Sequence, residues 1–313
     1  MIKIYKTNEK NIMTEIENIE ENCWIDLINP TADEITDVIE ATGIDSHLII
    51  KILDDEEMPR IETSGNATLI VVDTPYFEDR RHKNKYSTHP FGIIISTNNY
   101  FVTISLKECE MLTDFITGKV KSFFTYKKTR FTIQLLLKIS MAYQKYLKLI
   151  NEDIEAKEKV LYKSTSNKEL ISLLNTEKSL VYFITALKAN DIILEKLVKG
   201  NTIPLFEDDG DLLDDAIIEN KQGMEMANIY REILSSMSDT YATIISNNLN
   251  QVMKFLAGIT IIFSVPTMIA SFLGMNVPLG HFGESDIAFM IIILLSLILS
   301  VAIALFLKKK DML

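Results

Sequence analysis

The sequence has few of the residues that would point to a disulfide framework, a nucleic-acid interface or an enzyme. Cys23 and Cys109 are the only cysteines, far apart and without a paired motif, so we expect no disulfides and a reducing compartment. The net charge is −11 and no basic stripe occurs, which argues against nucleic-acid partners. No nucleophile elbow or phosphate loop is present, and the histidines have no metal-ligand spacing: His47, His82, His89 and His281. We therefore do not expect an enzyme.

A long apolar run is also missing from the N-terminal part of the chain. Residues 1–6 have no apolar h-region, so we expect no cleavable signal peptide. The length of 313 residues suits about two domains. The composition averages two unlike parts, a charged N-terminal body and a nearly uncharged C-terminal tail.

Residues 1–125 show the pattern of an α/β domain. Short apolar, β-branched runs predict strands at 2–5, 24–28, 67–73, 91–96 and 100–105. Thr31 and Glu34 have capping-box spacing and predict a helix that reaches about Ala41, with Gly43 behind it. A second short helix is expected at 47–53, and Asn98-Asn99 predicts a hairpin turn.

Residues 126–253 are predicted to form a helical stalk. Apolar residues recur at helical spacing over 130–163 and again over 167–199, which predicts an antiparallel helix pair. A third helix starts near Leu212 and meets no proline before Pro266, a length typical of a coiled coil or a membrane span. Ten acids against two bases over 207–253 make this helix strongly acidic.

Residues 254–313 are predicted to be a membrane domain. The segments 255–273 and 287–307 carry no charge, and about 20 apolar residues cross a bilayer. The link at 274–286 contains acids but no Lys or Arg, whereas three lysines follow the second span. The positive-inside rule then places both termini in the cytoplasm, for a multi-pass protein of the inner (plasma) membrane.

Small and hydroxylated residues follow one side of the third helix and the first span. They form two seven-residue series: Ser236, Thr243, Asn250, Ala257, Ser264 and Ser271; and Asp239, Ser246, Met253, Thr260, Thr267 and Gly274. Close helix packing in the membrane is one interpretation. The other is a water-filled lumen lined by several copies of the helix, which requires a cyclic homo-oligomer. Met253 and Leu256 are either packing residues or an apolar constriction.

The first span ends in Gly274-Met275-Asn276, and this triplet after the first of two terminal spans resembles the CorA family of divalent-cation channels. Further residues resemble landmarks of that family: Pro266-Thr267, Trp24-Ile25-Asp26, Met58-Pro59-Arg60 and Thr202-Ile203-Pro204-Leu205-Phe206. The resemblance covers essentially the whole chain. It implies an α+β cytoplasmic domain, long stalk helices and two C-terminal spans, assembled as a funnel-shaped homopentamer in membrane lipid.

The resemblance also implies a function and its residues. We expect passive, potential-driven uptake of hydrated Mg²⁺, with cobalt and nickel as further candidate ions, and a selectivity filter at Gly274, Met275 and Asn276. Neutral amide and carbonyl oxygens suit an ion that dehydrates reluctantly. By position, the expected pore-lining residues are Asn250, Met253, Leu256, Ala257, Thr260, Ser264, Thr267 and Ser271.

Three positions depart from the family's pattern. Leu273 stands where an aromatic residue is frequent, and Ser264 where some members have an apolar ring. Family members close when Mg²⁺ binds between neighbouring cytoplasmic domains; Asp215, with Asp214 beside it, fits one side of that site, but Lys51 stands on the other. Asp54, Asp55, Glu56 and Glu57 lie close by and are candidate substitutes for the missing acid. One alternative is an ion pair between Lys51 and Asp215 in place of ion sensing, and another is that the acidic cluster is only a solvated surface.

Two other functions remain open on the sequence. The same architecture could move zinc or another transition metal, although the expected lining has no Cys or His, the ligands that softer ions favour. A membrane-anchored sensor or scaffold without conduction is an alternative from a different class.

Overall fold

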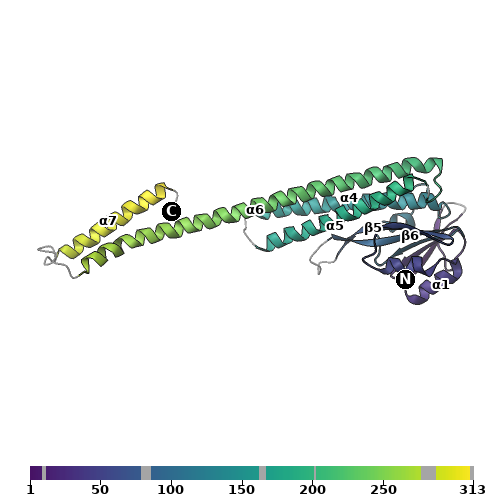
Figure 1. Cartoon of the computed structure of the whole chain (residues 1–313), viewed down its shortest axis with the longest axis horizontal. Coiled ribbons are helices and arrows are strands. Elements are labelled where there is room, and N and C mark those ends of the chain that lie inside the picture. The colour runs from purple at the N-terminus through teal and green to yellow at the C-terminus, as the bar shows by residue number, and fades with distance from the viewer. Residues whose placement is uncertain (9–11, 79–85, 162–166, 201, 276–286, 311–313) are drawn as a thin grey trace. The chain divides into compact units, whose positions relative to one another are not determined.

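The computed structural model describes residues 1–8, 12–78, 86–161, 167–200, 202–275 and 287–310. These residues fall into two compact units, Met1–Met237 and Ser238–Leu313. The first unit contains an α/β body and three long helices, and the second contains the two apolar helical segments (Figure 1).

A seven-stranded sheet forms the centre of the first unit, in the order β2-β1-β3-β7-β6-β5-β4. Strands β3 and β7 pair in parallel, and the other neighbours are antiparallel. The strands are β1 (Ile2–Thr7), β2 (Met13–Glu15), β3 (Trp24–Ile28), β4 (Arg60–Ser64), β5 (Ala67–Phe77), β6 (Tyr86–Ser96) and β7 (Phe101–Ser105).

One face of the sheet is covered by α1 (Ala32–Thr42), α2 (Ser46–Ile50) and the 3₁₀ turn η1 (Lys51–Leu53). The predicted capping box is present, because the Thr31 hydroxyl accepts from the Glu34 N–H and the Glu34 carboxylate accepts from the Thr31 N–H. Gly43 ends α1 in the left-handed conformation that glycine adopts without strain. Aliphatic side chains from this layer and from alternate strand positions form the core between them.

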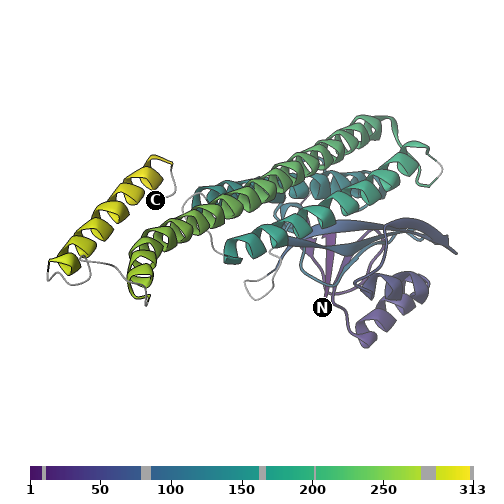
Figure 2. The same cartoon turned by 60° about the vertical axis from the view of Figure 1, so that its left-hand side comes forward.

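The opposite face is covered by α4 (Lys128–Leu161) and α5 (Asn167–Val198), so the sheet lies between two helical layers (Figures 1 and 2). The Phe131 ring of α4 stacks on Phe101 and meets the edge of Trp24. On α5, the Asn190 side chain accepts from the Asp73 N–H at 2.9 Å and donates to the Asp73 carbonyl at 2.8 Å. These contacts fix both helices to the sheet.

The strands differ from prediction where apolar residues are sparse. β5 continues to Phe77 and β6 begins at Tyr86, because the polar segments that contain Pro75 and Pro90 pair with each other. The short edge strands β2 and β4 and the helix α3 (Leu112–Ile116) have no apolar periodicity and were not expected. The other predicted strands, the hairpin turn with Asn99 at φ 69° and the antiparallel helix pair are confirmed.

Among the described residues, three helices are long and apolar enough to cross a membrane, by length and composition. The most apolar window of α5 is 44% buried, because α5 packs on β5 and β6 as a core helix. The corresponding windows of α6 (Gly210–Leu273) and α7 (Ala288–Lys309) are only 6% and 11% buried. The apolar surfaces of α6 and α7 are therefore the ones left for lipid or for further copies.

Candidate ion pathway along α6

In the first unit, one face of α6 packs on α4 and α5. Its buried residues recur every seven positions, as Leu213, Asn220, Ala227 and Leu234, with Ala216 and Gly223 in a second series. Hydrogen bonds fix the same face: Asn220 donates to the Leu187 carbonyl at 3.0 Å, and Ser140 and Gln144 donate to the Ala216 and Glu219 carbonyls. We call these positions the packing face of α6.

The polar series predicted from the sequence lies on the other side of the helix. Each of its positions follows a packing-face position by two residues, which is a rotation of about 200° around an α-helix. Continued into the first unit, it falls on residues that are all exposed: Asp215, Ile218, Gln222, Glu225, Ile229, Glu232 and Ser236. Ile218 and Ile229 are 60% and 54% exposed despite their apolar side chains. We call this side the lining face.

The same division continues in the second unit. Gly258 is buried and Ile262, Val265 and Ile269 are half-buried, and all four continue the seven-residue series of the packing face. The predicted pore-lining residues are all exposed: Asn250, Met253, Leu256, Ala257, Thr260, Ser264, Thr267 and Ser271. A single chain therefore leaves the whole lining face uncovered along α6.

Three hydroxyls on the lining face share a geometry that suits a hydrated cation. Thr260 donates to the Leu256 carbonyl at 2.8 Å, Ser264 to the Ile261 carbonyl at 2.8 Å, and Thr267 to the Phe263 carbonyl at 2.9 Å. Because each hydroxyl proton is used within the helix, the oxygen lone pairs are left as acceptors. Water in the shell of a cation presents hydrogens outward, so these oxygens can accept hydrogen bonds from it.

Two residues of the predicted filter lie at the end of α6. The Gly274 N–H donates to the Ala270 carbonyl at 2.9 Å, and Met275 follows, 55% exposed. Asn276 lies outside the described residues, as does the rest of the predicted outer link. The filter thus stays a prediction.

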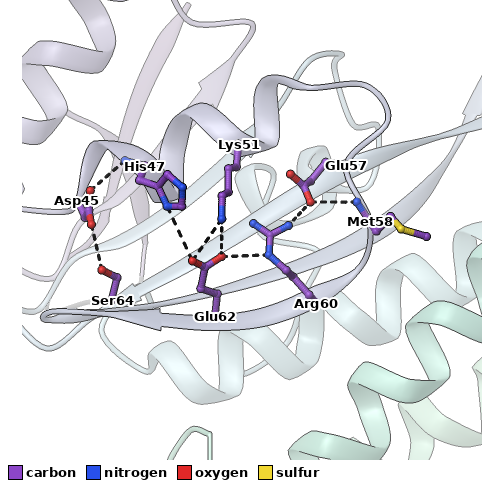
Figure 3. Close-up of polar contacts among 8 residues, drawn as sticks. All are labelled: Asp45, His47, Lys51, Glu57, Met58, Arg60, Glu62 and Ser64. Carbon is purple, nitrogen blue, oxygen red and sulfur yellow. Dashed lines mark hydrogen bonds and ion pairs between the residues drawn. The ribbon is translucent and has the colours of Figure 1, made fainter.

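The residues near the predicted regulatory site form an ion-pair network within one chain (Figure 3). The Glu62 carboxylate on β4 accepts from the Lys51 ammonium at 3.2 Å and from Arg60 Nε at 3.0 Å, with His47 Nδ1 at 3.8 Å. Hydrogen bonds from Lys51 and then Arg60 hold the Glu62 pKa below its usual value. Arg60 also pairs with Glu57. Lys51 thus has a partner in its own subunit, which the sequence analysis missed.

The acids proposed for metal binding are exposed. Asp214 and Asp215 lie on α6, and Asp54 and Asp55 lie on the turn after η1, where Asp54 accepts from the Glu56 N–H at 3.0 Å. Among the described residues, no group of three or more His, Cys, Asp or Glu side chains is placed to hold a metal ion within one chain. A regulatory site built from these acids would therefore need a neighbouring chain.

Comparison with known proteins identifies the family of this chain. The model of the CorA-like Mg²⁺ transporter protein family matches residues 20–309. The cobalt/magnesium transport protein CorA of Methanocaldococcus jannaschii is 28% identical over 263 residues, which cover 81% of this chain and 79% of the relative.

Solved structures show the same fold. The complete CorA magnesium transporter of Methanocaldococcus jannaschii superposes with a TM-score of 0.82 at 25% identity, over 99% of this chain and 96% of that one. The ZntB cytoplasmic domain of Vibrio parahaemolyticus is similar in fold, with a TM-score of 0.62 at 11% identity over 78% and 98% of the two chains. Because the family model spans nearly the full length, the chain belongs to the CorA-like Mg²⁺ transporter family.

Proposed function

We propose that five copies of this divalent-cation transporter surround an axis toward which each turns the lining face of α6. The observation that supports this most directly is the division of α6 into a packing face and an exposed lining face. A helix that carries hydroxyls on an uncovered side within an apolar span, and acids and an amide on the same side before that span, favours water or equivalent copies of itself on that side. A central wet path satisfies both needs.

The path carries hydrated Mg²⁺ into the cytoplasm. Asn276, with Gly274 and Met275, forms a ring of neutral oxygens at the outer mouth, which holds the ion through its water shell. The hydroxyls of Thr260, Ser264 and Thr267 continue this function inside the membrane. Membrane potential drives the movement, at about 2.3 kcal/mol per elementary charge per 100 mV.

Met253 and Leu256 form the apolar constriction of the path. Their side chains are 58% and 53% exposed on the lining side of a single chain, so they are free to meet their equivalents at the axis. A narrow apolar ring excludes water and thereby stops ions. Lys308 and Lys309 end α7 and Lys310 follows it, so by the positive-inside rule we expect this end of the path and the α/β body to lie in the cytoplasm.

Flux into liposomes tests the proposal. Purified wild-type protein should load the liposomes with Mg²⁺, and Asn276→Ala should abolish loading. Asn248→Ala is the matched control, because Asn248 lies on the side of α6 opposite Asn250, and it should load normally. Unchanged flux in Asn276→Ala would remove this residue from the filter. Stable oligomers without any flux would instead support a sensor or scaffold.

Thiol accessibility tests the lining separately. Cysteines at Thr260 and Thr267 should react with a water-soluble thiol reagent in membranes, whereas cysteines at Leu294 and Leu305 on α7 should not. Those two leucines are 58% and 64% exposed in a single chain and face outward from α7. If the α7 cysteines react faster than those of α6, a wet path along α6 is excluded.

Competition between ions tests the choice of cargo. The relative's name includes cobalt, so cobalt should compete with Mg²⁺ for the same path. Zinc as the preferred ion would instead appear as uptake that Mg²⁺ does not reduce.

We further propose that internal Mg²⁺ closes the path by binding between neighbouring subunits, with Asp214 and Asp215 on one side and Asp54 and Asp55 on the other. Internal Mg²⁺ should then reduce flux in the wild type and have less effect in Asp215→Ala. Equal inhibition of the two proteins would show that these acids do not sense the ion. In that case Lys51 would act only in its ion pair with Glu62.

A further inference from the structure

One acid of the acidic segment that leads into α6 is buried. Asp209, the last residue of the 3₁₀ turn η2 (Glu207–Asp209), is only 3% exposed. Every other acid described at 208–239 is exposed or half-buried. A carboxylate is unfavourable in a protein interior unless a group of opposite charge or hydrogen-bond donors hold it. A specific contact therefore accounts for the position of Asp209.

Arg130 of α4 makes that contact. Its Nη1 donates to Asp209 Oδ1 at 3.1 Å and to the Asp208 carbonyl at 3.3 Å, so one guanidinium holds both a side chain and the backbone just before α6 begins. The preceding residue, Thr129, donates to the Pro204 carbonyl at 3.0 Å. The first turn of α4 thus holds the whole segment that enters α6.

Two further contacts join α4 to the same helix. Ser140 donates to the Ala216 carbonyl at 3.4 Å, and Gln144, one turn later, donates to the Glu219 carbonyl at 2.9 Å. Because these contacts and the one from Arg130 all come from α4, together they fix the rotation of α6 about its own axis. The lining face lies about 200° around the helix from the packing face, so its direction follows from them.

The pair of Arg130 and Asp209 contributes more to orientation than to stability. A buried ion pair gains little over apolar packing of the same volume. Arg130 Nε is also buried without a hydrogen-bond partner among the described residues, which weakens the pair further. A planar guanidinium does hold its donors in a fixed arrangement, whereas a lysine ammonium is a point charge on a flexible stem. The pair therefore specifies one setting of α6.

We infer that Arg130 is a positioning residue for the control of transport. By holding Asp209 it orients the first two turns of α6, which carry Asp214 and Asp215. It touches no ion itself. The inference rests on the proposed closure of the path by internal Mg²⁺, because those two acids form one side of that site.

Hydrogen exchange of the full chain in lipid tests the orientation without transport. In Arg130→Gln, the amides at 214–219 should exchange roughly 10- to 100-fold faster than in the wild type, as loss of a hydrogen bond to a charged group predicts. The amides at 227–236 should keep their rates. Lys138→Gln is the matched control: it removes an ion pair of the same helix, with Asp114 at 2.8 Å, and should change neither segment. Unchanged exchange at 214–219 in Arg130→Gln overturns the inference.

Flux at graded internal Mg²⁺ separates orientation from stability. Arg130→Lys keeps a positive charge beside Asp209, so it should unfold near the wild-type temperature. The internal Mg²⁺ concentration that halves its flux should nevertheless rise severalfold, whereas flux without internal Mg²⁺ should stay at the wild-type level. Loss of flux in step with loss of thermal stability would contradict the inference. A wild type that internal Mg²⁺ does not inhibit would refute the proposed closure alone, because the exchange rates decide the role of Arg130 separately.

Discussion

Loss of solvation raises the pKa of two carboxyl groups of the α/β body, the buried Asp26 and the half-buried Asp73, to about 6. Asp26 accepts from the Thr103 hydroxyl at 2.7 Å, and that hydroxyl accepts from the Trp24 indole N–H at 2.7 Å. Asp73 is different, because Asn190 hydrogen-bonds only to its backbone, and burial alone raises the pKa of its carboxyl group. Asp73 is therefore the better place to measure what an ionised carboxylate costs this fold.

Asp73→Asn should stabilise the protein at neutral pH. The folded-state pKa lies above the unfolded value of about 3.9. The wild type therefore becomes more stable as the pH falls from about 7 toward 4, and less stable as the pH rises through the same range. The variant lacks this dependence, and at pH 7 its unfolding free energy should be higher by about 3 kcal/mol. Thermal unfolding of the detergent-solubilised proteins at pH 7 and pH 5 measures the difference. Asp33→Asn, an exposed acid on α1, is the control.

At the scale of elements, local chemistry predicts some structures and not others. Thr31, Glu34 and Gly43 predict both ends of α1, because capping and the left-handed turn need only neighbours in sequence. β4 is not predictable in this way, since it exists through its register with β5. The same register brings Glu62 next to Lys51, eleven residues earlier in the chain. The sequence alone does not identify this ion pair, because the pair depends on the tertiary fold.

Helix η1 and strand β6 meet at a glycine. A Cβ on Gly92 would lie 2.7 Å from Ile52 Cγ1 and 2.9 Å from its Cδ1, and Ile52 is fully buried. Gly92→Ala should therefore destabilise the body by about 1–3 kcal/mol, as overpacking does. Ile52→Ala should then destabilise the Gly92→Ala chain less than it destabilises the wild type in thermal unfolding, because the added Cβ occupies part of the space that the smaller side chain leaves. Gly210→Ala is the control, because a Cβ there meets open space. Equal effects of Ile52→Ala in the two backgrounds would point to another cause.

At the scale of the whole molecule, one seven-residue repeat runs along α6 through both units of the chain. The sequence alone predicts the polar series, because its period is plain, but not which side of α6 packs on α4 and α5. Both series of the packing face contain small or polar residues such as Ala216, Asn220 and Gly223. By residue type alone, the packing face therefore cannot be told from the lining face. Their burial follows from contacts with residues such as Leu187 and Ser140.

The acids of the lining face should attract cations from the cytoplasmic side. Glu225, Glu232 and Asp239 are spaced by seven residues and are exposed on α6, so in a cyclic oligomer each would form a ring of carboxylates. Charged walls of this kind raise the local concentration of counter-ions roughly 10- to 1,000-fold for a whole cleft, and less for one ring. Glu232→Gln should therefore lower, severalfold, the Mg²⁺ current that enters from the cytoplasmic side in planar bilayers at low ionic strength.

Added salt separates this effect from a structural one. The loss in Glu232→Gln should shrink as monovalent salt rises, because the Debye length falls from about 30 Å at 0.01 M to about 10 Å at 0.1 M. Glu195→Gln makes the same charge change on the exposed side of α5 and should leave the current unaltered. A loss in Glu232→Gln that is independent of salt, or one that Glu195→Gln matches, would mean that these carboxylates do not face the path. The lining face would then be limited to the apolar part of α6, which is C-terminal to these acids.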